Sequence, residues 1–300
     1  MSIFIGSGTA VCTPFFEDGK LNLEAYKKII RFQLENDSDA IISCGTTGEV
    51  STLTNDEHVE VARTAVETVK NGARKIPVIA GAGGNDTRNI IDLGKKLQAV
   101  GVDAIMVVTP YYNKTSQRGL IEHFSMIAAA VDLPIMMYNI AVRTALNMLP
   151  KTMYELSKIE NIAAVKEASG DIVQVAEIIE RCGDKLDVYS GNDDWIVPVL
   201  SLGGKGVVST LANIAPKQVH SLVTKYLEGN VKESAKMQLE MMGLIRALFA
   251  DVNPMPVKEA LNIMGFEAGP CRRPLTNIDE SVKSELIAQM KKQGLETIIK

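Results

Sequence analysis

The sequence has no apolar stretch close to the ~18 residues that a membrane-spanning helix requires. Its four cysteines are far apart and form no C-x-x-C pair, which disfavours a zinc site or a disulfide framework; they are Cys12, Cys44, Cys182 and Cys271. Residues 1–6 contain no basic region followed by an apolar run, so we expect no secretory signal. Thiols without such a signal predict a cytoplasmic protein, because the cytosol keeps them reduced.

The sequence also lacks a surplus of basic residues. It has 32 Lys and Arg against 36 Asp and Glu, and its basic residues occur in short pairs rather than clusters. This pattern disfavours a surface for nucleic acid or for anionic lipid. The histidines are too dispersed to suggest a metal site; they are His58, His123 and His220. Asp86 stands where a dinucleotide-binding loop needs its third glycine, which disfavours a nucleotide-dependent oxidoreductase.

What the sequence does have is a hydrophobic fraction of 46% over 300 residues, which is enough for a sizeable core. Short runs rich in Val, Ile and Met alternate with amphipathic, helix-like stretches such as Leu23–Leu34 and Asp56–Lys70. Nearly continuous apolar runs are typical of strands buried on both faces of a parallel sheet. The predicted strands are Gly8–Thr13, Ala40–Cys44, Ile76–Ala80, Ala104–Thr109, Pro134–Tyr138, Ile162–Val165, Leu186–Ser190 and Lys205–Thr210.

Eight strand–helix units end by about residue 228, and eight is the number at which a parallel sheet closes into a barrel of ~250 residues. An open doubly wound sheet is the alternative, but it usually has fewer strands. We therefore predict an α/β fold, a (β/α)8 TIM barrel, over residues 1–228. Three more helix-like stretches predict a helical extension packed on the barrel over residues 229–300; they are Ser234–Ala250, Pro256–Met264 and Asp279–Lys292.

Lys166 follows the apolar run Ile162–Val165, so a barrel would place its amine at the mouth where such folds hold their reactive groups. Burial and a nearby cation both lower the pKa of a lysine. A neutral amine can attack a ketone, and the resulting imine is an electron sink for an adjacent carbanion. Glu167 should point to the opposite face, because neighbouring residues on a strand alternate. The alternative is a surface lysine in an ion pair at a strand end.

Other polar residues follow neighbouring predicted strands. Tyr138 ends the preceding strand, and its hydroxyl could move a proton to a carbinolamine. The loop Gly45–Glu49 offers hydroxyls and glycine amides that suit a carboxylate, and Arg143 offers a fork for one. Asp193 and Asp194 are interpreted as caps of the helix that follows them. Taken singly, each of these residues also fits an ordinary role in a turn, a cap or packing.

Taken together, these segments occur in the order of a known family, over about residues 6–274. They are Gly45–Glu49, Pro110–Lys114, Tyr138–Ile140 with Arg143-Thr144, Val165–Ala168, Ser190–Asp193, Gly206–Ser209 and Asn253–Lys258. The ordered set resembles the dihydrodipicolinate synthase family, within the wider group of Schiff-base pyruvate aldolases that includes N-acetylneuraminate lyase. Thr47, and Arg143 five residues after Tyr138, favour the synthase branch.

The resemblance implies an aldol condensation of pyruvate with L-aspartate 4-semialdehyde. The product would be 4-hydroxy-tetrahydrodipicolinate, at the first committed step of lysine and diaminopimelate biosynthesis. Lys166 would form the imine with pyruvate, and Thr46, Tyr112 and Tyr138 would form a proton relay. Tyr112 would enter the site of a neighbouring subunit, and the family suggests a homotetramer. No metal or organic cofactor is implied, because the lysine itself is the electron sink.

The resemblance also implies the substrate-binding residues. Thr47 would hold the pyruvate carboxylate, and Arg143 would anchor the carboxylate of the semialdehyde. Gly191 and Val208 match backbone positions that line the pocket. The loop that orients Arg143 departs from the family, which often has a proline and another small residue before the arginine and a glycine two residues after it. Here the corresponding residues are Ile140–Val142 and Ala145.

A second departure concerns the feedback site for lysine found in many bacterial relatives. That site uses a histidine and a glutamate at positions that correspond here to Asn55 and Asn89, whereas His58, Asn85 and Tyr111 match it. A lost carboxylate can no longer pair with the ammonium of a ligand. We therefore predict poor inhibition by lysine.

Three alternatives remain open at this stage. A sister aldolase that cleaves a 2-keto-3-deoxy sugar acid or N-acetylneuraminate would share Lys166 and Tyr138 but would not need Arg143. A non-catalytic barrel that only binds a keto acid or serves in an assembly would form no covalent adduct with pyruvate. A nucleotide-dependent oxidoreductase would bind NAD(P)H.

Overall fold

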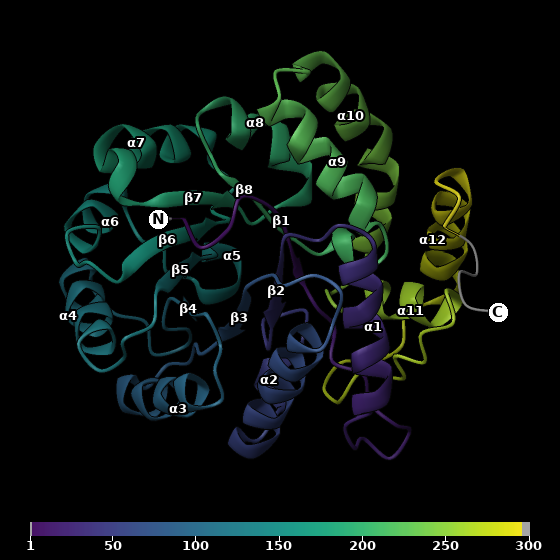
Figure 1. Cartoon of the computed structure of the whole chain (residues 1–300), viewed down its shortest axis with the longest axis horizontal. Coiled ribbons are helices and arrows are strands. Elements are labelled where there is room, and N and C mark those ends of the chain that lie inside the picture. Colours follow the sequence, from purple (N-terminus) through teal and green to yellow (C-terminus); the bar gives the residue numbers. More distant parts are fainter. Residues whose placement is uncertain (1, 296–300) are drawn as a thin grey trace.

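The computed structural model describes residues 2–295 and contains a closed barrel of eight parallel strands. The strands pair in sequence order, and β8 pairs with β1 to close the barrel (Figure 1). Their bounds are β1 Gly6–Ala10, β2 Ala40–Ser43, β3 Val78–Gly81, β4 Ala104–Val108, β5 Ile135–Asn139, β6 Ile162–Glu167, β7 Asp187–Ser190 and β8 Gly206–Ser209. The predicted fold class, a (β/α)8 TIM barrel with a C-terminal helical part, is confirmed.

Helices follow the strands and surround the barrel, so that the strands are buried from both sides. They are α1 Leu23–Glu35, α2 Asn55–Lys70, α3 Thr87–Ala99, α4 Gln117–Ala128, α5 Ala141–Thr144, α6 Pro150–Leu156, α7 Ile172–Cys182, α8 Ile196–Ser201 and α9 Pro216–Leu227. Short 3-10 turns are η1 Val50–Thr52, η2 Gly183–Lys185, η3 Asp193–Trp195 and η4 Leu211–Asn213. Side chains that include Ile42, Ile79, Met106 and Met136 form one buried apolar cluster.

The first predicted strand is shifted, since β1 covers Gly6–Ala10 and not Gly8–Thr13. Gly6 pairs with Gly206 where β1 meets β8, and a Cβ on Gly206 would collide with the carbonyl oxygen of Gly6. Only glycine allows so close an approach of two backbones. The strand therefore begins in residues that hydrophobicity does not mark. The other seven predicted strands agree with the observed ones to within two residues at each end.

The C-terminal part forms the helices α10 Val231–Leu248, α11 Met255–Ile263 and α12 Glu280–Lys292. Figure 1 shows α10 beside α9, with α11 and α12 on the side of the molecule that also carries α1. Leu248 of α10 and Leu261 of α11 belong to the same buried cluster as Ile30 of α1. The tail also reaches α2, because the guanidinium of Arg272 donates hydrogen bonds to the carboxylate of Glu57. The extension therefore shares one core with the barrel.

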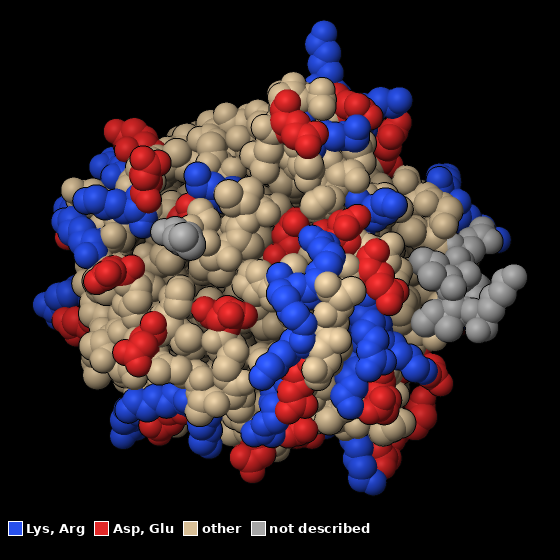
Figure 2. Space-filling model, viewed as in Figure 1, with Lys and Arg blue, Asp and Glu red and all other residues tan. Residues whose placement is uncertain are grey.

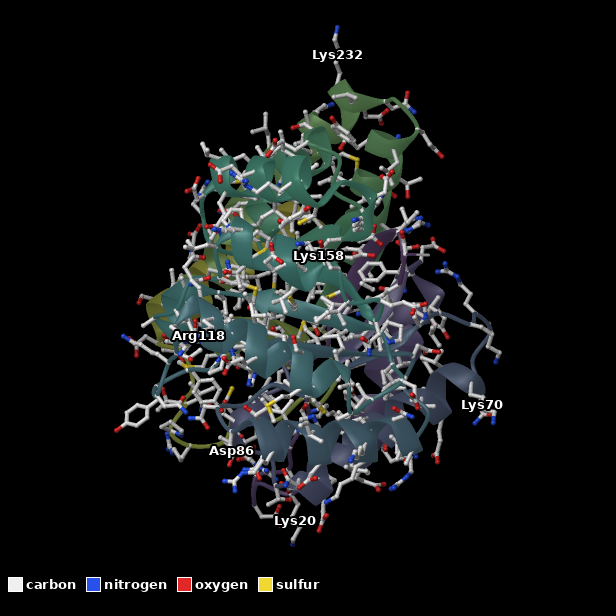
Figure 3. All side chains as sticks on the ribbon, turned by 90° about the vertical axis from the view of Figure 1, so that its left-hand side faces the viewer. Lys20, Lys70, Asp86, Arg118, Lys158 and Lys232 are labelled. Carbon is white, nitrogen blue, oxygen red and sulfur yellow. The ribbon has the colours of Figure 1, made fainter. Side chains whose placement is uncertain are left out.

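The surface carries charges of both signs. Figure 2 shows basic and acidic side chains side by side over α1 and α2, with tan residues between them. In Figure 3, Lys20 and Lys232 project from opposite ends of the molecule. None of the helices within residues 2–295 is long and apolar enough to cross a membrane.

Candidate active site

Lys166 and Tyr138 lie side by side inside the barrel. They are register partners near the carboxyl ends of β6 and β5, and 6% and 5% of their respective surfaces are exposed. The Nζ atom of Lys166 is 4.2 Å from the centroid of the Tyr138 ring. No carboxylate of residues 2–295 forms an ion pair with Lys166. The alternative of a surface lysine in an ion pair is therefore wrong.

The surroundings of Lys166 favour its neutral form. Burial lowers the pKa of this amine to about 8; the carboxylate of Asp193 opposes the shift and the charge of Arg143 adds to it. At pH 7 roughly a tenth of such an amine is neutral, about 300-fold more than for an ordinary lysine. The amine is therefore available as a nucleophile near physiological pH.

Gly191 leaves room for Lys166. A Cβ on Gly191 would lie 3.3 Å from Cε of Lys166 and 2.7 Å from the Cβ of Ala168. Its N–H donates to the carbonyl of Glu167 at 2.8 Å. The side chain of Glu167 points away from the amine, as predicted, and it accepts hydrogen bonds from Asn139 and Ser169. It is nevertheless buried, because the face opposite Lys166 is covered by helices.

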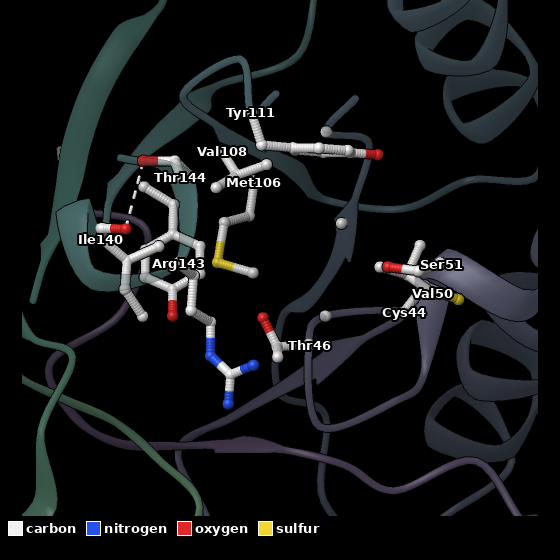
Figure 4. Close-up of a pocket in the computed structure, with 14 residues that line it drawn as sticks. Cys44, Thr46, Val50, Ser51, Met106, Val108, Tyr111, Ile140, Arg143 and Thr144 are labelled. Carbon is white, nitrogen blue, oxygen red and sulfur yellow. Dashed lines mark hydrogen bonds between the residues drawn. The ribbon is translucent and has the colours of Figure 1, made fainter. Parts of the chain in front are cut away.

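A cavity of about 250 Å³ opens beside this pair, and Thr46, Tyr138 and Arg143 are among the residues that line it. Figure 4 shows the side chains of Arg143 and Thr46 next to each other, with Ser51 on the opposite side and Tyr111 above them in this view. Burial raises the pKa of Tyr138 to about 12, while Arg143 and Thr46 oppose that shift. The phenol is therefore protonated at neutral pH and can donate a proton.

Thr47 lies deeper than Thr46 and is held by a residue of the extension. Its Oγ1 accepts a hydrogen bond from Nδ2 of Asn253 at 3.0 Å. The backbone carbonyl of Asn253 in turn accepts from Nη2 of Arg143 at 3.4 Å. Asn253 therefore joins two predicted carboxylate-binding residues. Asn253 is the first residue of a segment that matches the family, which is a signal in the sequence, but its position between two predicted tail helices did not indicate a contact with the site.

A buried ion pair fixes the loop that carries Thr46 and Thr47. The Nζ atom of Lys258 on α11 lies 2.6 Å from Oε1 of Glu49, and both side chains are buried. The backbone N–H of Arg272 donates to the other oxygen of Glu49 at 2.8 Å. Sequence reasoning missed this pair, because its partners are 209 residues apart.

Arg143 lies on α5, a helix of four residues. Ala145 ends this helix with a φ of +53°, in the left-handed region where a side chain costs roughly 1–2 kcal/mol. This is the position at which the family often has glycine. This loop therefore has the left-handed backbone conformation that glycine favours, although the residue in that position is an alanine.

Val208 is buried on β8, in the same apolar cluster as Tyr138.

Tyr112 does not line the cavity of its own chain. Its side chain is 93% exposed and its φ is +70°, in the loop between β4 and α4. The neighbouring Tyr111 lines the cavity, and its carbonyl accepts from Asn85 at 3.2 Å. The carbonyl of Asn85 accepts a hydrogen bond from Asn113 at 2.8 Å. Asn85 therefore holds the loop through the residues on both sides of Tyr112.

The predicted role of Asp193 needs a correction. Its carboxylate does not cap the helix after it, but accepts from the backbone N–H of Thr210 at 3.1 Å and of Leu211 at 2.8 Å. It therefore caps η4, since the loop after β7 folds against the end of β8. There it also approaches Lys166 closely enough to affect its pKa.

Fold and site together define a (β/α)8-barrel protein with a buried lysine at the carboxyl end of the sixth strand. The model of the dihydrodipicolinate synthetase family matches residues 3–293. The chain belongs to this family, and the resemblance stated from its motifs is confirmed.

Individual relatives cover almost the whole chain. A 4-hydroxy-tetrahydrodipicolinate synthase of Lachnoclostridium phytofermentans is 54% identical over 296 residues, which are 98% of this chain and 100% of the relative. The dihydrodipicolinate synthase of Aquifex aeolicus has a crystal structure that matches with a TM-score of 0.95 at 40% identity, over 99% of this chain and 100% of that one. The enzyme of Cyanidioschyzon merolae, solved with lysine bound, matches with a TM-score of 0.95 at 39% identity, over 98% and 100%.

Proposed function

We propose that the protein is a lyase, a 4-hydroxy-tetrahydrodipicolinate synthase that condenses pyruvate with L-aspartate 4-semialdehyde. The observation that carries the proposal is the buried amine of Lys166, which lies against the ring of Tyr138 and forms no ion pair within residues 2–295. Tyr138, Arg143 and Thr46 line the cavity beside it. Relatives that bear this name are about half identical to the chain over nearly all of its length, which favours this reaction over the cleavage of a sugar acid.

The chemistry begins with the neutral amine of Lys166, which attacks the ketone carbon of pyruvate to give a carbinolamine. Tyr138 donates the proton with which the hydroxyl leaves as water, and the imine forms. Loss of a methyl proton gives an enamine, whose carbon attacks the aldehyde of the second substrate and forms the new C–C bond. The amino group of that substrate then attacks the imine carbon, the ring closes, and Lys166 leaves as the free amine.

Proton transfer in this scheme involves three hydroxyls. Thr46 and Tyr138 come from one chain, and Tyr112 comes from a neighbouring subunit. The exposure of Tyr112 supports this assignment, because a tyrosine that is 93% exposed is available to a second chain. Val142, which precedes the cavity residue Arg143 and is 83% exposed, adds an apolar side chain that is likewise available to a second chain. We accordingly propose that the protein is a homotetramer. We also propose a cytoplasmic location, which rests on the thiols and not on Tyr112.

Two carboxylates have to be held. Thr47 binds that of pyruvate, and Arg143 binds that of the semialdehyde through its guanidinium. Gly191 and Val208 shape the pocket around the imine. We propose that residues 229–300 serve the barrel of residues 1–228 in this task, because Asn253 contacts both Thr47 and Arg143.

Trapping with borohydride tests the proposal. The protein is incubated with pyruvate, reduced and digested, and the mass gain is mapped; we expect it on Lys166. Turnover with pyruvate and L-aspartate 4-semialdehyde is then compared with cleavage of 2-keto-3-deoxy sugar acids and N-acetylneuraminate. Faster turnover of a sugar acid would overturn the choice of substrate, and the lack of any adduct would support a non-catalytic barrel.

We further propose that lysine inhibits this protein poorly. Asn55 is the first residue of α2 and Asn89 lies on α3, and both are exposed. His58, a residue that does match the feedback site, has its Nε2 at 2.6 Å from the carbonyl of Gly81. Inhibition by lysine should therefore strengthen in the variant Asn89→Glu, which restores a carboxylate, and stay weak in the matched control Asn89→Gln. Strong inhibition of the unmodified protein would contradict the proposal.

A further inference from the structure

Glu167 is a buried carboxylate with no cationic partner in the part of the chain that the structure describes. Its Oε1 accepts from the backbone N–H of Ser169 at 2.7 Å, and its Oε2 accepts from Nδ2 of Asn139 at 3.0 Å. Nε2 of Gln174 on α7 is 3.5 Å from Oε1. A buried carboxylate that is held only by neutral donors is costly to maintain. The proposed reaction does not use this side chain.

The partner of Glu167 belongs to a wider network outside the barrel. Asn139 also donates to Oδ1 of Asn147 at 2.8 Å, and its own Oδ1 accepts from the backbone N–H of Met148 at 2.9 Å. Asn147 donates to Oε1 of Gln174 at 2.8 Å. The network thus connects β5, β6, α7 and the segment that follows α5, the helix on which Arg143 lies.

The position of this network relative to the site is specific. Asn139 and Glu167 are the residues directly after Tyr138 and Lys166, and both pairs are register partners on β5 and β6. Because side chains alternate along a strand, the bond between Asn139 and Glu167 lies on the outer face, directly behind the phenol and the amine on the inner face. A one-residue slip would turn every side chain to the other face.

Building on the proposed function, we propose that Asn139 and Glu167 are positioning residues for the imine chemistry. Their bond fixes the register that places the amine of Lys166 against the ring of Tyr138. Through Asn147 and Met148, the same network holds the segment after Arg143. Neither residue touches the substrate, so their effect on the reaction passes through Lys166 and Tyr138.

Single and double substitutions test this role. Glu167 accepts hydrogen bonds from two donors, the backbone N–H of Ser169 and Nδ2 of Asn139. In Glu167→Gln only one of the two side-chain atoms is an acceptor, so the amide nitrogen has to face one of these donors. Asn139→Asp places two carboxylates against each other. In the double variant Asn139→Asp/Glu167→Gln, the new amide can donate to the new carboxylate, so the bond between the two strands is restored. The side-chain amide of Asn147, which accepts from Asn139 in the unmodified protein, has to turn over to donate to the same carboxylate. We expect each single variant to lose about 10- to 100-fold in kcat, as for a misplaced reacting group, with a small change in KM for pyruvate. The double variant should recover most of the loss.

The matched control is Thr152→Val. The Thr152 side chain is buried, and its hydroxyl donates a hydrogen bond to Gln117 at 2.6 Å. Gln117 in turn donates to the backbone carbonyl of Asn147. Within residues 2–295, neither Thr152 nor Gln117 is hydrogen-bonded to Asn139 or Glu167. Thermal midpoints are recorded for all variants, and kcat is compared among the folded ones. Thr152→Val should lose stability and keep its kcat. If Asn139→Asp does not fold, the comparison of Glu167→Gln with the double variant decides.

The outcomes separate the two proposals. If the unmodified protein forms no adduct with pyruvate, the proposed function fails and this role fails with it. If it forms the adduct and Glu167→Gln forms it at the same rate, with the same kcat, the positioning role alone is overturned. A double variant that is no faster than Glu167→Gln also overturns it, because mismatched donors would not then be the cause of the loss.

Discussion

Lys166 and Lys258 are both buried lysines, and each amine lies 4.2 Å from the centroid of an aromatic ring, Tyr138 in one case and Phe15 in the other. They differ in their carboxylates. The Nζ atom of Lys258 lies 2.6 Å from the carboxylate of Glu49. Lys166 has no such contact within residues 2–295, and the charge with the largest effect on its pKa is that of Asp193. The oxygens of Asp193 accept hydrogen bonds from Ser209, Thr210 and Leu211.

The difference shows what turns a buried lysine into a reactive one. A close carboxylate offsets the loss of hydration and stabilises the ammonium, so the pair serves as a structural link. Without it, burial lowers the pKa of Lys166 to about 8. The structural lysine also serves the reactive one, since Glu49 ends the loop that carries Thr46 and Thr47.

The largest expected effect is the loss of turnover when the reactive lysine, and not the structural one, is replaced. Lys166→Ala should abolish both turnover and the adduct trapped with pyruvate, because the other buried lysine of residues 2–295, Lys258, is paired with Glu49 and leaves no second amine for the imine. The fold should persist, since the substitution removes a buried polar group that forms no ion pair in the described part of the chain, and circular dichroism would verify this. Residual turnover that is not due to contaminating enzyme would show that Lys166 is not the nucleophile.

The next largest effect falls on stability. Lys258→Met leaves the carboxylate of Glu49 buried without its partner, and the free energy of unfolding should fall by about 3–5 kcal/mol. In the double variant Lys258→Met/Glu49→Gln, the amide can still accept from the N–H of Arg272, and most of the loss should be recovered. Urea denaturation measures both. An unchanged stability of Lys258→Met would mean that the pair is not a structural link.

A smaller effect concerns the ring over which the reactive amine lies. Tyr138→Phe keeps the ring but removes the hydroxyl, so turnover should fall by about 10²-fold or more, as for the loss of a proton-transfer group. The matched control is Phe15→Tyr at the other lysine, which should leave kcat unchanged. A Tyr138→Phe variant with the rate of the unmodified protein would remove this residue from the relay.

The smallest effect is a shift in pH dependence. The rate at which pyruvate forms the imine should rise with pH and level off above about 8, because only the neutral amine of Lys166 attacks. Arg143→Met removes a charge that lowers the pKa of Lys166, so its profile should move to higher pH. Asp193→Asn removes a charge that raises this pKa, so its profile should move to lower pH. Shifts in the same direction would contradict the assignment of the profile to Lys166.

Much of the fold could be predicted because it repeats. Each apolar run marked a strand, and eight of them allow few arrangements other than a closed barrel. The exception was β1, which begins at Gly6 because two glycines meet across the β1–β8 contact. Lys166 could be singled out for a similar reason, since a charged residue directly after an apolar run lies at a strand end.

The supporting contacts of the site could not be predicted. Asn253 and Lys258 are about 200 residues from the loop that they hold, and nothing in the sequence next to either residue indicates a partner. Asp193 was interpreted as a cap for the next helix but caps η4, because the two loops meet only in the closed barrel. The burial of Glu167 likewise depends on α7 covering the outer face.

The sequence by itself determined the order of the elements, the face of the strand on which each side chain lies, and the family, because these depend on periodicity and on short motifs. Only the tertiary structure decided which lysine is paired with a carboxylate and which is not. Ionisation and hydrogen bonding depend on which groups meet after folding, and most of those meetings join residues that are far apart along the chain.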